Sequence, residues 1–450
     1  MKSTRLRALC TLLVVATACS APGVPEPVTI DGTWEGTLTS GTNNHMLRLL
    51  LSQDSDGLKG TVDFPDQYAT GYALRDVSLT GSSLRFSFPD ALPPALFTGT
   101  FDRGRIFGTL LGAAGPDTTR GEFELWRRPP ESKPFRTEEV SFANGTVPLR
   151  GTLFIPNSSG PHPAVVFLHG SGPQTRESYI RYFADQFARN GFAALIYDKR
   201  NTGRTDIPLW QQGGGSFADF ADDATTAVRF LRGRSDAVDS RRIGLWGLSQ
   251  GAWLAPLAAQ RIEGVSFLVL LSGGGVTPAR QELYDDEVKL RAGGFSESHI
   301  SEAMSLLRLA NAYVRSHTDA DWERVQRGLA RARTEPWFRL LDRFPLILPR
   351  ESPAWSDTDL DYDPRPVLTR LRMPVLVILG ERDALTPTAE TTRAIDAALR
   401  AAGNTSYAIR VVPRADHGLF VSTGGNGWLG ERPASGWVSD MIEWVVAHSR

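Results

Sequence analysis

Two patterns of apolar and polar positions divide the chain. From Ile30 to Arg128, short segments such as GTWEGTLTS, GLKGTVDF and SLRFSFP alternate apolar with polar residues, and Gly, Asp and Asn separate them. Alternation with a period of two, with turn residues about every eight to twelve positions, is typical of strands that bury one face. We therefore expect an antiparallel β-rich domain over 27–128, either a small barrel or a sandwich, followed by a linker, RRPPESKPF, at 127–135.

The second pattern begins after the linker. The segment EEVSFANGTVPLRGTLFIP predicts a hairpin that turns at Asn144–Gly145. Beyond it, apolar runs without alternation, such as AVVFLHG, AALIYD and PVLVILGERD, are separated by amphipathic helical segments. Such runs indicate strands that are buried on both faces, as in a parallel sheet covered by helices. The pattern predicts an α/β domain over 135–450 with a mostly parallel sheet.

One interval interrupts this alternation of strands and helices. Residues 276–372 carry charged amphipathic helical segments such as ESHISEAMSLLRLANAYVRS and no strand pattern. The interval lies between two predicted neighbouring strands, FLVLLSG and PVLVILG. We expect a helical cap, inserted over the carboxyl edge of the sheet.

The first residues have the features of an export signal. MKSTRLRALCTLLVVATACS contains three basic residues, then an apolar run, then small residues, which predicts a signal peptide over 1–19. Its end, ATAC, resembles the lipobox of bacterial lipoproteins and implies lipidation of Cys19, although ATA also fits ordinary signal cleavage. We expect an exported protein of the periplasm or cell envelope, whose only membrane contact is this lipid anchor. Cys10 is the only other cysteine, so no disulfide is expected.

Charge and histidine placement limit the classes of partner. The formal net charge of -1 gives no basic surface for nucleic acid. The histidines outside the motifs below are scattered without a ligand spacing, and no metal or other cofactor is expected: His45, His162, His299, His317 and His448. No sequence feature indicates the oligomeric state.

A serine between two glycines is the strongest chemical signal. In RIGLWGLSQG a buried strand runs into Gly247-x-Ser249-x-Gly251, and a helical segment follows at once. A strand-to-helix turn this tight needs residues without a Cβ beside the serine, and it exposes the serine hydroxyl at the sheet edge. A plain turn serine would show the same five residues, so the partners decide between the two interpretations.

A nucleophilic serine needs a base, and the base needs an acid that orients it. Asp383 ends the run PVLVILGERD and His417 follows the run YAIRVVPRADHG, in the chain order Ser, Asp, His that suits this sheet. Glu381 and Asp416 are the alternative acids, and His169 is an alternative base. Asp416 is the weaker alternative because neighbours on one loop rarely face each other well.

Together, the motifs HGSGP, DKRNTGRT, GLSQG, GERDALTP and DHG resemble the α/β-hydrolase fold, and in particular bacterial esterases with an N-terminal β-rich domain. The resemblance implies Ser249 as nucleophile, Asp383 as acid and His417 as base. It also implies an oxyanion hole formed by the backbone N–H of Gln250 and of Ser171, with Gly172 as the alternative to Ser171. Asn201 and Thr205 depart from the commoner DKRGxGxS.

These features predict a serine hydrolase that cleaves a small-molecule carboxylic ester, with a short acyl chain, through an acyl-enzyme. Two alternatives remain open. One is a peptidase or acylaminoacyl-type amidase of the same fold, although no acidic motif for a substrate amino terminus is evident. The other is an envelope binding protein that has the fold without the chemistry, because a fold does not fix a function.

Overall fold

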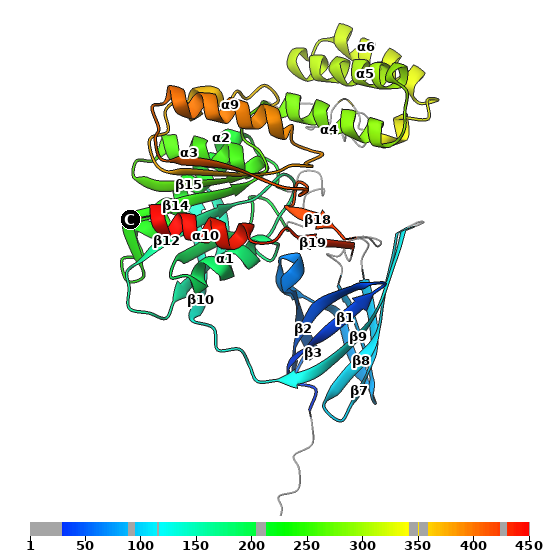
Figure 1. Cartoon of the computed structure of the whole chain (residues 1–450), viewed down its shortest axis with the longest axis vertical. Helices are drawn as coiled ribbons and strands as arrows, with labels where there is room; N and C mark the ends of the chain where they lie inside the picture. The colour runs from blue at the N-terminus through cyan, green and yellow to red at the C-terminus, as the bar shows by residue number, and fades with distance from the viewer. Residues whose placement is uncertain are drawn as a thin grey trace, which may run out of the picture.

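The computed structural model describes residues 29–88, 95–114, 117–203, 213–341, 350, 359–423 and 430–449. Two sheets organise these residues, an antiparallel one near the N-terminus and a mixed one after it (Figure 1). The predicted leader, with Cys19, lies outside the described residues, as does Thr205. No helix in the described ranges has the length and apolar character needed to cross a membrane.

The N-terminal sheet has nine antiparallel strands in the order β4-β3-β2-β1-β9-β8-β7-β6-β5. Its first and last strands follow one another in the chain, and Leu74 between them donates its N–H to Gly60 O at 2.9 Å, so the sheet is a nearly closed barrel. The strands are β1 Gly32–Ser40, β2 Asn43–Asp54, β3 Gly57–Phe64, β4 Ala69–Ala73, β5 Arg75–Thr80, β6 Ser83–Phe88, β7 Ala95–Asp102, β8 Arg105–Ala114 and β9 Asp117–Arg128.

The alternation in the sequence becomes the inside and outside of this sheet. In β2, Leu47, Leu49 and Leu51 are buried, while Met46 and Leu50, at alternate positions of the strand, are 47% and 52% exposed. The inward side chains form a core of the domain's own, with Trp34 and Phe97 among its largest members. The predicted β-rich domain is confirmed, and of the two predicted shapes the barrel is the one observed.

The second sheet has eight strands in the order β10-β11-β13-β12-β14-β15-β16-β17, and every neighbouring pair from β13 onward is parallel. Its strands are β10 Phe135–Asn144, β11 Val147–Pro156, β12 His162–Leu168, β13 Ala193–Tyr197, β14 Val238–Leu248, β15 Val265–Leu271, β16 Val375–Gly380 and β17 Tyr407–Val412. Residues of β13 and β16 are buried throughout, as their uninterrupted apolar sequences predict. The predicted α/β fold class is confirmed.

The hairpin of β10 and β11 differs from the prediction by one residue. Asn144 pairs with Val147, so the turn consists of Gly145 and Thr146. Gly145 takes φ 58°, a conformation that glycine adopts without the steric cost that a side chain brings. The predicted turn placed Asn144 in the loop and was wrong there, because the glycine and not the asparagine takes the left-handed position.

Helices cover both faces of this sheet (Figure 1). Helices α2 (Phe217–Arg232), α3 (Gln250–Arg261) and α9 (Thr388–Ala401) contribute to the core on one face, and α1 (Ile180–Arg189) and α10 (Trp437–His448) to the core on the other. A short hairpin, β18 (Phe420–Ser422) with β19 (Glu431–Pro433), follows β17.

The insertion between β15 and β16 is helical in its described residues. It contains α4 (Pro278–Ala292), α5 (Glu297–Ser316), α6 (Asp319–Ala332), η3 (Phe338–Leu340) and α8 (Arg365–Leu368). Apart from α8, these elements share a core of their own, in which Leu307 and Trp337 are buried. Figure 1 shows α5 and α6 beyond α4, away from the sheet.

The two domains meet around Tyr68, which follows the short helix η1 (Pro65–Gln67). Although Tyr68 belongs to the β domain, it is 4% exposed and packs in a core of the second sheet. Its ring lies 4.8 Å from that of Phe420 and 5.2 Å from that of Phe183, and its hydroxyl accepts a hydrogen bond from Trp437 Nε1. The β domain is therefore anchored by an aromatic side chain inserted into its neighbour.

Candidate active site

Ser249 lies at the tight turn between β14 and α3. Its backbone has φ 55° and ψ −113°, which is unusual for a residue with a side chain and indicates local strain. Its N–H donates to Leu271 O at 2.8 Å, which ties the turn to the end of β15. The serine is therefore fixed at the carboxyl edge of the parallel strands, as the Gly-x-Ser-x-Gly pattern predicts.

The two glycines of the turn are required by close backbone packing. A Cβ on Gly247 would lie 2.1 Å from Gly251 O, and a Cβ on Gly251 would lie 2.5 Å from Leu168 O. Both distances are far below a normal contact, and the atoms met are backbone atoms that cannot rotate away. Any larger residue at either position would push α3 away from β12 and β14 and would displace Ser249.

Asp383 and His417 are joined directly. His417 Nδ1–H donates to Asp383 Oδ2 at 2.8 Å, and the Asp383 side chain is fully buried. The other carboxylate oxygen, Oδ1, accepts from the backbone N–H of Leu385 and of Thr386 at 2.8 and 2.7 Å. With both oxygens held, the carboxylate orients the imidazole and leaves its Nε2 unprotonated in the neutral ring.

A threonine links this pair to the segment beside the serine. Thr386 Oγ1 donates to Ser272 O at 3.0 Å and lies 3.5 Å from His417 Nδ1. Ser272 directly follows Leu271, whose carbonyl holds the N–H of Ser249. In the described part of the chain no hydrogen bond joins the Ser249 hydroxyl to His417, so the structure brings them to one sheet edge without joining them; such bonds are often long before substrate binds.

The two alternative acids and the alternative base form hydrogen bonds with other residues. Glu381 is exposed and its Oε2 accepts from the N–H of Arg414 at 2.7 Å. Asp416 Oδ1 accepts from the N–H of Phe420 at 2.8 Å, and burial raises the pKa of its carboxyl. His169 is buried beneath the Gly-rich loop, where its Nε2–H donates to Tyr197 O at 2.7 Å and burial lowers its pKa to about 4. Among the residues that the structure describes, no hydrogen bond joins the side chain of any of the three to Ser249 or to the His417 ring.

The Gly-rich loop after β12 lies against the serine. A Cβ on Gly170 would lie 3.6 Å from Ser249 Cβ, so the loop and the turn are in contact. Gly170 N–H donates to the Tyr179 hydroxyl at 3.2 Å, and Ser171 O accepts from Gln174 Nε2 at 3.1 Å. Ser171 itself is exposed, and Gly172 takes φ 80°. The predicted oxyanion donor Ser171 therefore lies on a loop whose backbone is fixed by hydrogen bonds to Tyr179 and Gln174.

Gln250 is the first residue of α3, and its side chain meets Lys199. Lys199 Nζ donates to Gln250 Oε1 at 2.6 Å and to Gly170 O at 2.9 Å, which joins the helix start to the Gly-rich loop. No pattern in the sequence indicates a role for Lys199, although it stands in the motif DKRNTGRT. In the same motif Asn201 takes φ 61° at the position of the more common glycine, a conformation that asparagine tolerates better than most residues.

The cap reaches this edge through α4. The Tyr284 hydroxyl donates to Asp383 O at 3.4 Å, and Arg280 forms an ion pair with Glu390 of α9 at 2.9 Å. The first part of the insertion thus contacts the backbone of Asp383. Among the described residues, no group of three or more His, Cys, Asp or Glu side chains is arranged to hold a metal ion.

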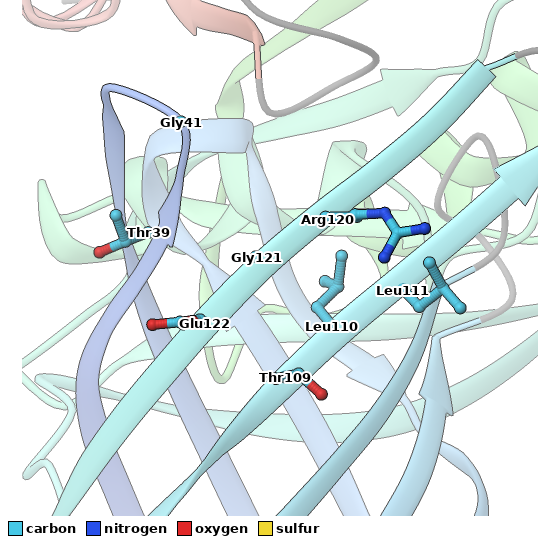
Figure 2. A pocket seen from close by; sticks show the side chains of 8 residues that line it. All are labelled: Thr39, Gly41, Thr109, Leu110, Leu111, Arg120, Gly121 and Glu122. Atoms are coloured by element: carbon cyan, nitrogen blue, oxygen red, sulfur yellow. The ribbon is translucent and has the colours of Figure 1, made fainter.

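A hollow of about 560 Å³ lies elsewhere, over β1, β8 and β9 of the β domain (Figure 2). No predicted site residue contributes to it, and Figure 2 shows its lining on neighbouring strands: Thr39, Gly41, Thr109, Leu110, Leu111, Arg120, Gly121 and Glu122. This hollow is thus separate from the predicted site residues at the carboxyl edge of the second sheet.

Two proteins of known name are similar to this chain in sequence. Esterase EstD of Thermotoga maritima is 29% identical over 308 residues, which are 64% of this chain and 63% of EstD. The thiohydrolase aneE of Aspergillus aculeatus is 33% identical over 119 residues, 26% of this chain and 35% of that protein. The chain thus spans less than two thirds of the length of either relative.

A solved structure of an esterase from Pyrococcus furiosus covers 70% of this chain and 92% of its own, with a TM-score of 0.42 and 18% identity. The model of the alpha/beta hydrolase family matches residues 165–424. This range includes the Gly-rich loop after β12, the serine turn and the Asp383–His417 pair. The chain belongs to the alpha/beta hydrolase family.

Proposed function

We propose that the protein is a serine esterase that cleaves carboxylic esters of short acyl chains through an acyl-enzyme. The observation that carries the proposal is the buried Asp383 bonded to His417 at the same sheet edge as Ser249. A carboxylate that holds one imidazole nitrogen, with the other nitrogen left to act as a base, is the arrangement that serine hydrolases need.

In the proposed reaction, Ser249 Oγ attacks the ester carbonyl carbon while His417 Nε2 takes the hydroxyl proton. The carbonyl oxygen becomes an anion, and the backbone N–H groups of Gln250 and Ser171 stabilise it. When this tetrahedral intermediate collapses, the C–O bond to the alcohol breaks and His417 returns the proton to the leaving oxygen. Asp383 keeps the ring in the tautomer that both transfers require, and a water molecule deacylates Ser249 by the same steps.

The test compares p-nitrophenyl acetate and butyrate with aminoacyl p-nitroanilides, in the wild type and in Ser249→Ala. We expect hydrolysis of the esters, with little of the amides, and its loss in Ser249→Ala. Faster turnover of aminoacyl amides would favour the peptidase alternative. Absence of Ser249-dependent hydrolysis of either class would favour a binding protein without this chemistry.

We also propose export and an N-terminal lipid anchor at Cys19, on the basis of the basic residues, the apolar run and the small residues of the leader. Mass spectrometry of the mature protein's N-terminus should show cleavage before a lipid-modified Cys19. An unmodified cysteine, or cleavage at another position, would contradict the anchor and leave export standing.

A further inference from the structure

Lys199 occupies an unusual position for a lysine. It is 5% exposed and follows β13, at the carboxyl edge of the sheet. Its ammonium group donates to Gly170 O and to Gln250 Oε1, and it lies 4.5 Å from the centre of the Phe220 ring. Both hydrogen-bond acceptors are uncharged, and no described carboxylate lies within ion-pair distance of this ammonium.

Such a position is costly for a lysine. Removing an ammonium from water without an opposite charge disfavours its charged form, and burial lowers the pKa of Lys199 to about 7. An apolar residue would fill the space without this cost. A buried lysine whose donors are directed at two specific oxygens is therefore a candidate for a functional role.

The two acceptors belong to the two halves of the proposed oxyanion hole. Gly170 O and the N–H of Ser171 are parts of one planar peptide unit, in which the oxygen and the hydrogen point in opposite directions. A bond that holds Gly170 O toward Lys199 therefore fixes the direction of the Ser171 N–H. The bond to Gln250 Oε1 in turn holds the residue whose backbone N–H is the other proposed donor.

We propose that Lys199 is the positioning residue of the oxyanion hole, setting the distance and direction between the N–H of Ser171 and the N–H of Gln250. This inference rests on the proposed esterase function and deepens it. Lys199 acts through the two backbone groups and not by contact with the substrate.

Charge adds a second effect. When Lys199 is protonated, its charge polarises the amide that contains Gly170 O, so the N–H on the other side of that amide becomes a stronger donor to a developing negative charge. The backbone of Lys199 is fixed as well, because its N–H donates to Gln174 O at 3.0 Å, and the Gln174 side chain holds Ser171 O. The loop is thus held at consecutive carbonyls, Gly170 by Lys199 and Ser171 by Gln174.

The test compares Lys199→Met with Lys133→Met, the same substitution at a linker lysine that pairs with Asp185. Each protein is assayed for kcat and KM with p-nitrophenyl butyrate. Each is also titrated with an alkyl trifluoromethyl ketone, whose adduct with Ser249 carries the oxyanion. Circular dichroism and melting temperature report whether the variants fold.

For Lys199→Met we expect kcat to fall on the order of 100-fold, the size of losing one oxyanion donor, with KM changed less than about twofold. Affinity for the ketone should fall by the same factor as kcat/KM, because both report binding of the anion. If Lys199 served only to stabilise the fold, kcat/KM and the affinity for the ketone would not fall by the same factor. Lys133→Met should leave all three quantities close to wild type.

Gln250→Leu is the second variant, needed if Lys199→Met does not fold. It removes one of the two contacts at a half-buried side chain, and kcat and ketone affinity should each fall about tenfold. Wild-type kcat and ketone affinity in whichever variant folds would overturn the inference while the proposed function stands. Absence of Ser249-dependent hydrolysis in the wild type would overturn both.

Discussion

The two sheets of the molecule use their side chains in opposite ways. In the β domain, alternate residues along the strands face one core, so the side chains that pack this domain lie within the strands themselves. In the hydrolase sheet the inner strands, such as β13 and β16, are buried on both faces. The residues of the candidate site follow the strand ends: Ser249 after β14, Asp383 after β16 and His417 after β17. Where a strand has no exposed face, polar chemistry is available only beyond its last residue.

The same comparison explains how the domains are joined. The residue of the β domain that enters the other core, Tyr68, is also beyond a strand, at the end of η1 with φ 53°. Its partner Phe420 is three residues after His417, so the β domain packs against the loop that carries the histidine. Substitutions in the two regions should therefore separate activity from stability.

The largest effect should come from Asp383→Asn. An asparagine keeps the shape but can hold the His417 ring in the wrong tautomer, so kcat should fall on the order of 10³- to 10⁴-fold. Steady-state hydrolysis of p-nitrophenyl butyrate measures this. Since the change leaves both cores intact, the melting temperature serves as the control, and near-normal activity would remove Asp383 from the triad.

Tyr68→Ala should lower the stability of the protein and leave most of its activity. Removing this buried ring leaves a cavity among Phe183, Phe420 and Trp437, which should lower the free energy of unfolding by about 3 kcal/mol. Urea denaturation followed by tryptophan fluorescence measures it. At temperatures where the variant is folded, kcat should fall less than about tenfold, far below the effect expected for a triad residue.

Two controls sharpen the Tyr68 result. Tyr68→Phe loses only the hydrogen bond from Trp437 and should cost about 1 kcal/mol. Trp126→Ala removes an aromatic side chain that is 44% exposed on the β domain, and it should change stability by less than about 0.5 kcal/mol. Equal costs for Tyr68→Ala and Trp126→Ala would show that Tyr68 does not anchor the domain.

The cap should limit the acyl chain. Because α4 places Tyr284 against Asp383, we expect kcat/KM for p-nitrophenyl palmitate to be at least about tenfold below that for the butyrate ester. A chain-length series from acetate to palmitate measures this. Equal hydrolysis of long and short esters would mean that the cap does not restrict the pocket.

The smallest effects should come from the alternative acids. Glu381→Gln and Asp416→Asn alter side chains that bond to the backbone of Arg414 and Phe420, so each should lower kcat less than about tenfold. The same butyrate assay applies. Inactivity of either variant, beside an active Asp383→Asn, would move the acid of the site to that residue.

The sequence predicted what depends on local pattern. Alternating and uninterrupted apolar runs indicated the two sheets, and the glycines around Ser249 indicated a turn that cannot accommodate a Cβ, as Gly247 and Gly251 show. The sequence favours Asp383 over Asp416 because sequence neighbours rarely face each other, and the structure has Asp383 beside His417.

The sequence could not predict contacts that depend on three-dimensional packing. Tyr68 stands in a segment with no distinguishing pattern, and its burial depends on the docking of two domains. Lys199 carries a charge, so a pattern of apolar positions predicts exposure, yet it is buried between Gly170 and Gln250. Thr386 and Ser272 are joined across 114 positions of sequence, and nothing local indicates their bond.

The most direct test of the central claim is labelling with a fluorophosphonate, which reacts with a serine activated by its histidine, followed by mass spectrometry of the peptides. We predict a single adduct on Ser249, much slower labelling in His417→Ala, and no adduct in Ser249→Ala. Labelling of a different residue, or undiminished ester hydrolysis by Ser249→Ala, would contradict the account.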